Sequence, residues 1–277
     1  MLNLNPEMKF AYFLKDRRLE LDERVLGLLA DLGAAGFDVY PVLDTEDICE
    51  GTEMLLSFGG DGTFLSAAAL ALDASLPILG VNFGRLGFLS ENKPESVADA
   101  LARKDYSIQM RGLVEVSGLS GGDGPQLALN EICVLREGPA MLGVDVEVDS
   151  LPLPTYWADG LLVATSSGST AYSLSAGGPI CLPDARVLII TPIAPHNLNV
   201  RPLVVPDSSD IRIRFRSRDS QVRLTVDNRN YDVPSDSELK IRAVPGALKR
   251  VVLGGSNFIG ALKARLLWGG DIRNQSE

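Results

Sequence analysis

The chain has 277 residues, of which 45% are hydrophobic and 22% charged, and this is enough for two folded domains with separate cores. Its net charge is −10, and the first 110 residues hold 18 acidic and 9 basic side chains, so nucleic acid and anionic membranes are poor candidates as partners. No apolar run reaches membrane-spanning length, residues 1–6 do not resemble a signal peptide, and the three cysteines lack zinc or disulfide spacing, so we expect a cytoplasmic protein.

The first 110 residues alternate predicted strands with predicted helices. Short apolar runs predict strands at 9–14, 38–43, 54–58 and 77–81, and longer amphipathic segments predict helices at 19–32, 63–72 and 95–103. Such alternation is typical of a mostly parallel sheet with helices on both faces. We therefore expect an α/β domain over residues 1–110, completed by residues 255–277 and their predicted helix at 258–267.

The most informative segment is residues 55–63, with the sequence LLSFGGDGT. Gly59, Gly60 and Gly62 allow the backbone to approach a bulky anion, and the helix that follows directs its free N–H groups to the same place. Because phosphate repels a carboxylate, Asp61 indicates Mg²⁺ binding or proton transfer. A tight turn with Asp61 as helix N-cap is the alternative interpretation. In either case we expect Asp61 to be a solvent-accessible turn residue.

From about residue 113, short β-rich runs replace the alternation. They lie at 126–135, 143–148, 161–164, 187–191, 211–215, 221–226 and 239–244, and turn residues separate them. This spacing predicts a β-rich, sandwich-like domain over residues 111–254. Four arginines, Arg212, Arg214, Arg216 and Arg218, share one face of a predicted strand. We interpret that face as solvated, and an anion-binding surface is the alternative.

A second glycine-rich turn lies within residues 159–179. A predicted strand ends in small hydroxyl residues, and a helix is expected to begin at an N-cap, Ser169, and run toward residue 176. The hydroxyls of Ser166, Ser167, Ser169 and Thr170 are short donors suited to ribose or phosphate. A hydroxyl-rich helix cap with a purely structural role and no ligand is the alternative. Two such turns, each with one aspartate, favour a binding function.

Six motifs carry a resemblance to a known family. They are GGDGT at 59–63, NE at 130–131, DG at 159–160, GSTAY at 168–172, SAGGP at 175–179 and WGGD at 268–271. In order and spacing the chain resembles the NAD kinase family from about residue 55 onward. The first motif alone also occurs in diacylglycerol-type lipid kinases and phosphofructokinase-like enzymes, whereas the block from residue 159 to 172 is much more specific.

The resemblance implies an α/β and β-sandwich enzyme that transfers the terminal phosphoryl group of ATP to the 2′-hydroxyl of the adenosine ribose of NAD, giving NADP. It implies Mg²⁺ or another divalent cation on the donor phosphates, although no metal-ligand motif is present. By motif position Asp61 resembles the general base. Asn130 and Glu131 resemble ligands of the adenosine side of NAD, Asp159 resembles a nicotinamide-end contact, and residues 170–175 resemble the adenine and ribose pocket. The implied substrate contacts are Gly62, Asn130, Glu131, Asp159, Thr170, Ala171, Tyr172, Ser173, Ser175 and Ala194.

Further candidates and departures complete the prediction. The further candidate site residues are Phe88, Trp157, Ser167, His196 and Arg229. Residues 193–196 resemble a loop that reaches a neighbouring subunit, so a homodimer or homotetramer with shared sites is expected, and a structural role for His196 is the alternative. Residues 227–229 read DNR where the family usually has DGQ, and SS at 166–167 replaces PT. Two other functions remain: a lipid or sugar kinase, and a non-catalytic NAD(P) sensor, which Arg229 keeps open.

Overall fold

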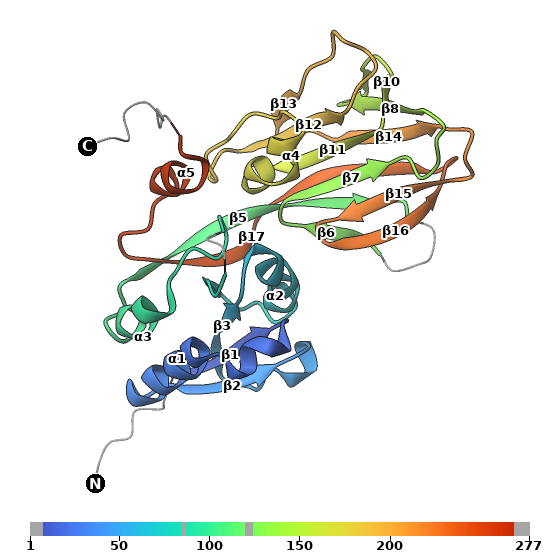
Figure 1. Ribbon diagram of the computed structural model, residues 1–277. Coiled ribbons are helices and arrows are strands. Elements are labelled where there is room, and N and C mark those ends of the chain that lie inside the picture. Colours follow the sequence, from blue (N-terminus) through green and yellow to red (C-terminus); the bar gives the residue numbers. More distant parts are fainter. Residues whose placement is uncertain (1–7, 85–86, 120–123, 269–277) are drawn as a thin grey trace. The chain divides into compact units, whose positions relative to one another are not determined.

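The computed structural model describes residues 8–84, 87–119 and 124–268. The chain divides into two compact units, of which the first comprises Met1–Met110 with Leu248–Glu277 and the second Arg111–Ala247. The division falls within two long strands, β5 (Tyr106–Ser117) and β17 (Glu238–Leu253), so each of them contributes residues to both units (Figure 1).

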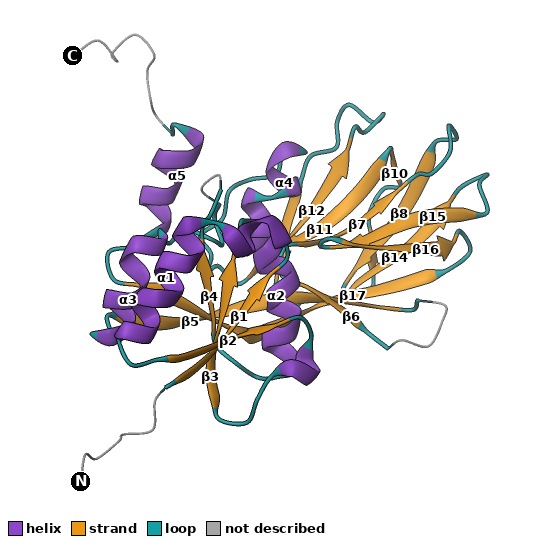
Figure 2. Cartoon of the chain, turned by 60° about the horizontal axis from the view of Figure 1, so that its bottom comes forward, coloured by secondary structure: helices purple, strands orange, loops and turns teal. Residues whose placement is uncertain are grey.

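The first unit is built on a parallel sheet. Its strands lie in the order β2 (Asp38–Val42), β1 (Lys9–Leu14), β3 (Thr52–Phe58), β4 (Ile78–Val81) and the end of β17. The helices are α1 (Glu23–Ala34), α2 (Asp61–Asp73), α3 (Pro94–Ala102) and α5 (Phe258–Leu266), with 3₁₀ turns at Arg17–Leu21 and Thr45–Asp47. Helices α1 and α3 pack together, and α2 packs on β3 and β4 (Figure 2). Residues 54–58 of β3 and all of β4 are buried, and apart from Ser57 they are apolar or glycine, as is typical of a parallel strand covered on both faces.

The second unit is an antiparallel sandwich. One sheet has the order β13 (Leu203–Pro206), β12 (Val187–Ile193), β11 (Gly160–Thr165), β7 (Glu131–Leu135), β15 (Gln221–Val226) and β16 (Arg229–Pro234). The other contains β10 (Tyr156–Ala158), β8 (Leu142–Val148), β14 (Ile211–Arg216) and the start of β17, with β9 (Leu151–Pro152), β5 and β6 (Gln126–Ala128) attached. Both sheets contribute to one core, in which Val144 and Ile213 join Val163 and Ile190.

The predicted fold class is confirmed, with local differences. The helix expected at 19–32 begins only at Glu23, because the Asp22 carboxylate caps it by accepting the Arg24 amide. The strand expected at 126–135 is two strands, β6 and β7, with a turn between them. Strands β5, β9, β10, β13 and β16 were not predicted. Among the described residues, no helix is both long and apolar enough to span a membrane.

The arginine-rich strand β14 has the alternating exposure expected of a half-solvated sheet. Arg214 forms ion pairs with Glu147 and Glu238, and Arg216 pairs with Asp145. These carboxylates come from the neighbouring strands β8 and β17. Arg214 and Arg216 are thus paired across an exposed sheet face, which agrees with the interpretation of a solvated face. Arg218 was expected on the same strand but lies beyond the end of β14.

Candidate functional site

The glycine-rich turn between β3 and α2 leaves open space next to Asp61, the first residue of α2. Gly60 is the N-cap, and no heavy atom lies within 4 Å of where a Cβ would stand on either Gly60 or Gly62. At Gly59, by contrast, a Cβ would lie 2.4 Å from the Thr63 hydroxyl oxygen, so this position requires glycine. The turn thus combines the free N–H groups of a helix N-terminus with room for a ligand.

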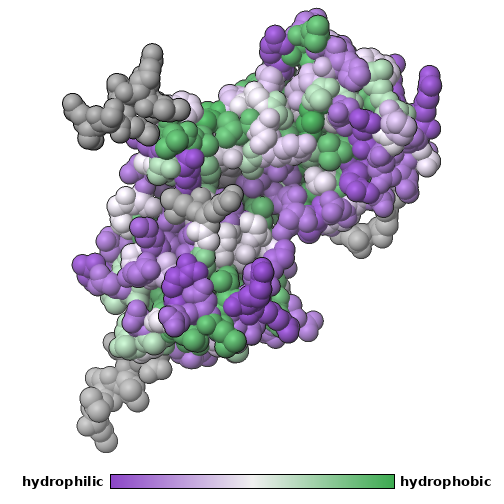
Figure 3. Space-filling model, viewed as in Figure 1, coloured by the Kyte–Doolittle hydropathy of each residue, from purple (hydrophilic) through white to green (hydrophobic). Residues whose placement is uncertain are grey.

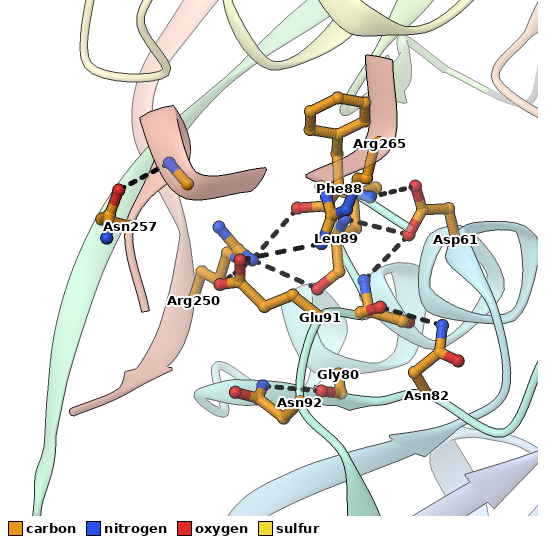
Figure 4. Close-up of polar contacts among 12 residues, drawn as sticks. Asp61, Gly80, Asn82, Phe88, Leu89, Glu91, Asn92, Arg250, Asn257 and Arg265 are labelled. Carbon is orange, nitrogen blue, oxygen red and sulfur yellow. Dashed lines mark hydrogen bonds and ion pairs between the residues drawn. The ribbon is translucent and has the colours of Figure 1, made fainter. Parts of the chain in front are cut away.

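Both carboxylate oxygens of Asp61 are engaged by the loop that follows β4. Oδ2 accepts the Phe88 amide at 2.7 Å, and Oδ1 accepts the amides of Leu89 and Ser90 at 2.9 and 2.8 Å (Figure 4). A Cβ on Gly87 would lie only 1.8 Å from Oδ1, so the close approach depends on glycine at this position. Asp61 is half-buried, and three backbone amides, which the sequence did not indicate, hold its carboxylate in place.

A buried ion pair supports the same loop from its other side. The Arg250 guanidinium lies 2.7 Å from Glu91 Oε1, and these side chains are only 7% and 9% exposed. Arg250 also donates to the carbonyl oxygens of Phe88 and Leu89 (Figure 4). Burial of a charge pair is favourable only when further hydrogen bonds satisfy it, and the loop carbonyls supply them. Arg250 thus holds the loop through the carbonyls of residues 88 and 89, and Asp61 holds it through the amides of residues 88–90.

In the second unit, Asp227 holds the Asn130–Glu131 turn. Its carboxylate accepts the amides of Leu129, Asn130 and Glu131 at 2.7, 2.8 and 3.2 Å. Burial nevertheless raises the pKa of Asp227 above its usual value, although these amides act in the opposite direction. Asp227, the first residue of the DNR sequence at 227–229, therefore orients Asn130 and Glu131.

Glu131 is a buried carboxyl group with an unusual protonation equilibrium. Burial, and secondarily the charge of Asp227, raises the pKa of Glu131 to about 8, with the Tyr172 backbone amide opposing the shift. Its Oε2 is buried and has no hydrogen-bond partner in the described part of the protein. At neutral pH the carboxyl is therefore mainly protonated, and it offers a ligand an O–H donor as well as an acceptor.

The hydroxyl-rich segment folds differently from the expected helix. A 3₁₀ turn covers Ser167–Thr170 and a short helix, α4, covers Tyr172–Ser175, so the predicted N-cap at Ser169 is wrong. The buried Ser169 hydroxyl donates to the Ser166 carbonyl and accepts the Cys181 amide. The buried Ser173 hydroxyl lies 3.2 Å from that of Thr191. These two side chains fix the segment to its surroundings, so their hydroxyls are not turned toward solvent.

Other members of this segment remain accessible. Tyr172 is 39% exposed, Ser175 is exposed, and Thr170, Ala171 and Ser167 are half-buried. The segment packs against the Asn130–Glu131 turn, because the Thr165 amide donates to the Asn130 carbonyl at 2.8 Å. A Cβ on Gly168 would lie 2.1 Å from that carbonyl oxygen, so only glycine permits this packing. The structure therefore brings the NE and GSTAY motifs together.

Asp159 has an ion-pair partner that the sequence analysis missed. Arg136 Nε lies 2.7 Å from Asp159 Oδ1, and Arg136 also donates to the Gly138 carbonyl. The two side chains are 34% and 41% exposed, so a ligand has access to them. Pairing of Leu135 with Gly160 in the sheet places Arg136 beside Asp159. Only the register of β7 and β11, which the sequence did not fix, would have revealed this neighbour.

The remaining predicted residues of the second unit lie at two places. The Asp159 amide donates to the Ile193 carbonyl and the His196 amide to the Trp157 carbonyl, so Trp157, Ala194 and His196 gather near Asp159. Arg229 instead points to β6, where its guanidinium donates to the Gln126 side chain and the Leu127 carbonyl. This guanidinium is already engaged.

The predicted site residues divide between the two units. Asp61, Gly62 and Phe88 belong to the first, and the other candidates belong to the second. Residues 269–271 of the final WGGD motif lie outside the described residues. Within the described ranges, no three His, Cys, Asp or Glu side chains form a group able to hold a metal ion. In phosphoryl-transfer sites Mg²⁺ is usually bound by one or two carboxylates, substrate phosphates and water, so such a site needs no cluster of three protein ligands.

The chain is similar to known proteins over nearly its whole length. The ATP-NAD kinase N-terminal domain matches residues 14–104, and the ATP-NAD kinase C-terminal domain matches residues 129–253. The NAD kinase of Flavobacterium johnsoniae is 37% identical over 273 residues, with 96% of this chain and 93% of that protein covered. The NAD kinase of Porphyromonas gingivalis strain W83 is 41% identical over 271 residues, with 96% and 88% covered.

Solved structures show the same fold. Yeast NADH kinase, solved with NADH, superposes with a TM-score of 0.82 at 24% identity, covering 98% of this chain and 91% of that one. An NAD kinase from Archaeoglobus fulgidus, solved with ATP, gives a TM-score of 0.73 at 28% identity, covering 95% and 98%. On the sequence matches over nearly its whole length, this chain belongs to the NAD kinase family.

Proposed function

We propose that this protein transfers the terminal phosphoryl group of ATP to the 2′-hydroxyl of the adenosine ribose of NAD, producing NADP. The observation that carries the proposal is the match of both NAD kinase domains and of NAD kinases across 96% of the chain. The relatives solved with NADH and with ATP support the two substrate classes. The enzyme is a phosphotransferase, and the roles of its individual residues are proposed below from the geometry.

Asp61 is proposed as the general base, with Oδ2 as the accepting atom. A ribose hydroxyl is a weak nucleophile, and a positioned carboxylate that takes its proton lowers the barrier. A carboxylate has about four lone-pair sites, and three amides occupy those of Asp61 unevenly. Oδ1 accepts two hydrogen bonds and Oδ2 only one, so Oδ2 keeps a free lone pair. The 2′-hydroxyl proton would therefore move to Oδ2 while the amides hold the carboxylate in position.

The donor phosphates would bind over the open turn. Backbone N–H groups at the start of α2 and the space beside Gly60 and Gly62 suit a polyanion. When bound, Mg²⁺ supplies charge neutralisation on the donor phosphates, and the protein contributes orientation. Dinucleotide binding is assigned to the second unit, where Asn130, neutral Glu131 and exposed Tyr172 offer polar contacts and Asp159 an acceptor.

A homo-oligomer is proposed on the surface near the Ala194–His196 loop. Ala194 has a φ of +45°, so the loop is held in an unusual backbone conformation next to Asp159. The nearby edge strand β13 exposes Leu203 and Val204, and Leu198 is 87% exposed. Hydrophobic residues are visible on the surface of the second unit in Figure 3. A fully active monomer in light scattering at assay concentration would contradict this proposal.

Incubation of the purified protein with NAD, ATP and Mg²⁺, followed by a coupled assay specific for NADP, tests the function directly. We expect NADP to accumulate in proportion to ADP. A lipid or sugar kinase would consume ATP only with those acceptors added. A sensor would bind NAD in calorimetry without forming NADP, and either result would overturn the proposal.

A further inference from the structure

One buried cation in the first unit is not explained by the contacts described so far. The Arg265 side chain, on α5, is only 6% exposed. Its Nε and Nη1 atoms are buried and have no hydrogen-bond partner within the described residues. A buried donor without a partner loses its hydrogen bonds to water with nothing in return, and the cost is larger when the donor is charged. Such a group therefore points to a partner that binds during function.

Glu91 does not satisfy Arg265. The Glu91 carboxylate pairs closely with Arg250, whereas Arg265 Nη2 lies 3.9 Å from its other oxygen, beyond hydrogen-bonding distance. Burial lowers the pKa of Arg265, and the charges of Glu91 and Asp61 act in the opposite direction. Arginine stays protonated in proteins, so the guanidinium is a fixed positive charge.

The position of this charge relates it to the proposed chemistry. Figure 4 shows Arg265 beside Asp61 and Phe88, and its guanidinium carbon lies 4.5 Å from the centre of the Phe88 ring. Phe88 is also the residue whose amide binds Asp61 Oδ2. The open space beside Gly60 and Gly62 belongs to the glycine-rich turn that contains Asp61. A cation with unused donors thus lies beside the candidate base, in the unit that carries the phosphate-type turn.

We propose that the Arg265 guanidinium binds an oxygen of the phosphoryl group that ATP transfers. This rests on the proposed function and names a further catalytic residue for it. As the 2′-oxygen bonds to phosphorus and the bond from phosphorus to the departing ADP oxygen breaks, the hydroxyl proton passes to Asp61. Arg265 stabilises the negative charge on the phosphoryl oxygens during this step. Because the Phe88 ring covers the guanidinium, binding requires that ring to move aside.

The test compares Arg265→Gln with Lys263→Gln, an exposed lysine on the same helix. Removal of one charge-stabilising donor costs about 10²–10³-fold in kcat in known cases, so we expect kcat/KM for ATP to fall by about 10²-fold in Arg265→Gln. We expect the KM for NAD and the rate of the Lys263 variant to stay near wild type. Arg265→Lys keeps the charge and should recover part of the loss, which also covers the case in which the Gln variant folds poorly.

A binding measurement separates this inference from the overall function. Calorimetry with the non-hydrolysable analogue β,γ-methylene-ATP should show affinity at least tenfold weaker in Arg265→Gln than in wild type. Equal affinity and equal kcat/KM for ATP in the two proteins would overturn the inference. An equal loss of affinity or of kcat/KM in Lys263→Gln would also overturn it. A wild-type protein that does not bind the analogue would do the same. If the wild type binds the analogue through Arg265 but forms no NADP, the proposed function fails and this assignment stands.

Discussion

Asp61 and Asp227 make nearly the same contacts in different surroundings. Each accepts hydrogen bonds from three consecutive backbone amides, those of residues 88–90 and those of residues 129–131. Beside Asp61 lie open glycines and the unsatisfied cation Arg265. Beside Asp227 lies Arg229, whose guanidinium is already engaged by β6. The hydrogen bonds alone therefore do not distinguish the proposed catalytic carboxylate from the proposed structural one, and the two differ instead in the open space and the unpaired charge beside them.

The largest expected effect is on turnover, from Asp61→Asn. Asparagine has similar size but does not take up the hydroxyl proton, so kcat should fall by about 10²–10⁴-fold or more. Its NH₂ group would also face the loop amides, so we expect a moderate loss of thermal stability as well. Initial rates together with thermal melts monitored by circular dichroism check both effects. Near wild-type turnover would show that Asp61 is only a turn residue.

Asp227→Asn should instead lower stability and weaken NAD binding. One side-chain oxygen is replaced by a donor that faces the amides of residues 129–131, at a cost of about 1–3 kcal/mol in the free energy of unfolding. Loss of orientation at Asn130 and Glu131 should raise the KM for NAD more than it lowers kcat. Urea unfolding and steady-state kinetics measure these, with exposed Asp232→Asn as the control. If Asp227→Asn lost most of its kcat but bound NAD as wild type does, Asp227 would not differ from Asp61 in role, and the proposed distinction between them would be wrong.

Glu131 makes the Asp227 region sensitive to pH. Because the folded-state pKa is about 8, above the ordinary value of 4.5, its stabilising contribution is complete below pH 4.5 and is lost as pH rises through 8. Glu131→Gln keeps a neutral side chain and should flatten the fall in Tm over this range. A difference of about 1 kcal/mol in the free energy of unfolding between wild type and variant corresponds to a shift in Tm of about 2–4 °C for chains of 150–250 residues.

Melting curves between pH 5 and 9 check the Glu131 prediction. The control is Glu53→Gln, which changes an exposed carboxylate on β3. Parallel curves for wild type and Glu131→Gln would mean that Glu131 is already ionised at neutral pH.

The smallest effect is expected for Asp159→Asn. The change leaves an acceptor but breaks a partly exposed ion pair with Arg136, and such pairs contribute less than about 1 kcal/mol. We expect a severalfold rise in the KM for NAD, with turnover changed less, because a contact present before the transition state is weakened. Steady-state kinetics with NAD varied provide the measurement. An unchanged KM with collapsed turnover would contradict a binding role.

The local chemistry of the turns was predictable from the sequence, because it depends on adjacent residues. Three glycines around Asp61 indicated an open turn, and apolar runs identified β3 and β4. The anion site at this turn stays a prediction. The partners of Asp61 were not predictable, since Phe88, Leu89 and Ser90 come from another loop and Arg265 from the final helix. Arg136 was missed for the same reason.

At the hydroxyl-rich turn, residue type did not reveal whether a side chain points to solvent or into the fold. Ser169 and Ser173 had the composition of ligand donors, yet their hydroxyls are used inside the fold. Strand β16 escaped prediction because its sequence RNYDVP shows no clear apolar alternation and contains a proline. The sheet register, which brings Asp159 to Arg136, is decided by long-range pairing.

Gly87 links two distant positions of the chain. With Asp61 Oδ1 only 1.8 Å from where its methyl would stand, alanine at 87 and a carboxylate at 61 exclude each other in this conformation. Gly87→Ala would push residues 88–90 away from Asp61 and remove the amide partners of its carboxylate. The carboxylate proposed as the base would then be more mobile. Substitutions at the two positions therefore depend on each other. A side chain at position 87 becomes tolerable only after the carboxylate at position 61 has been replaced.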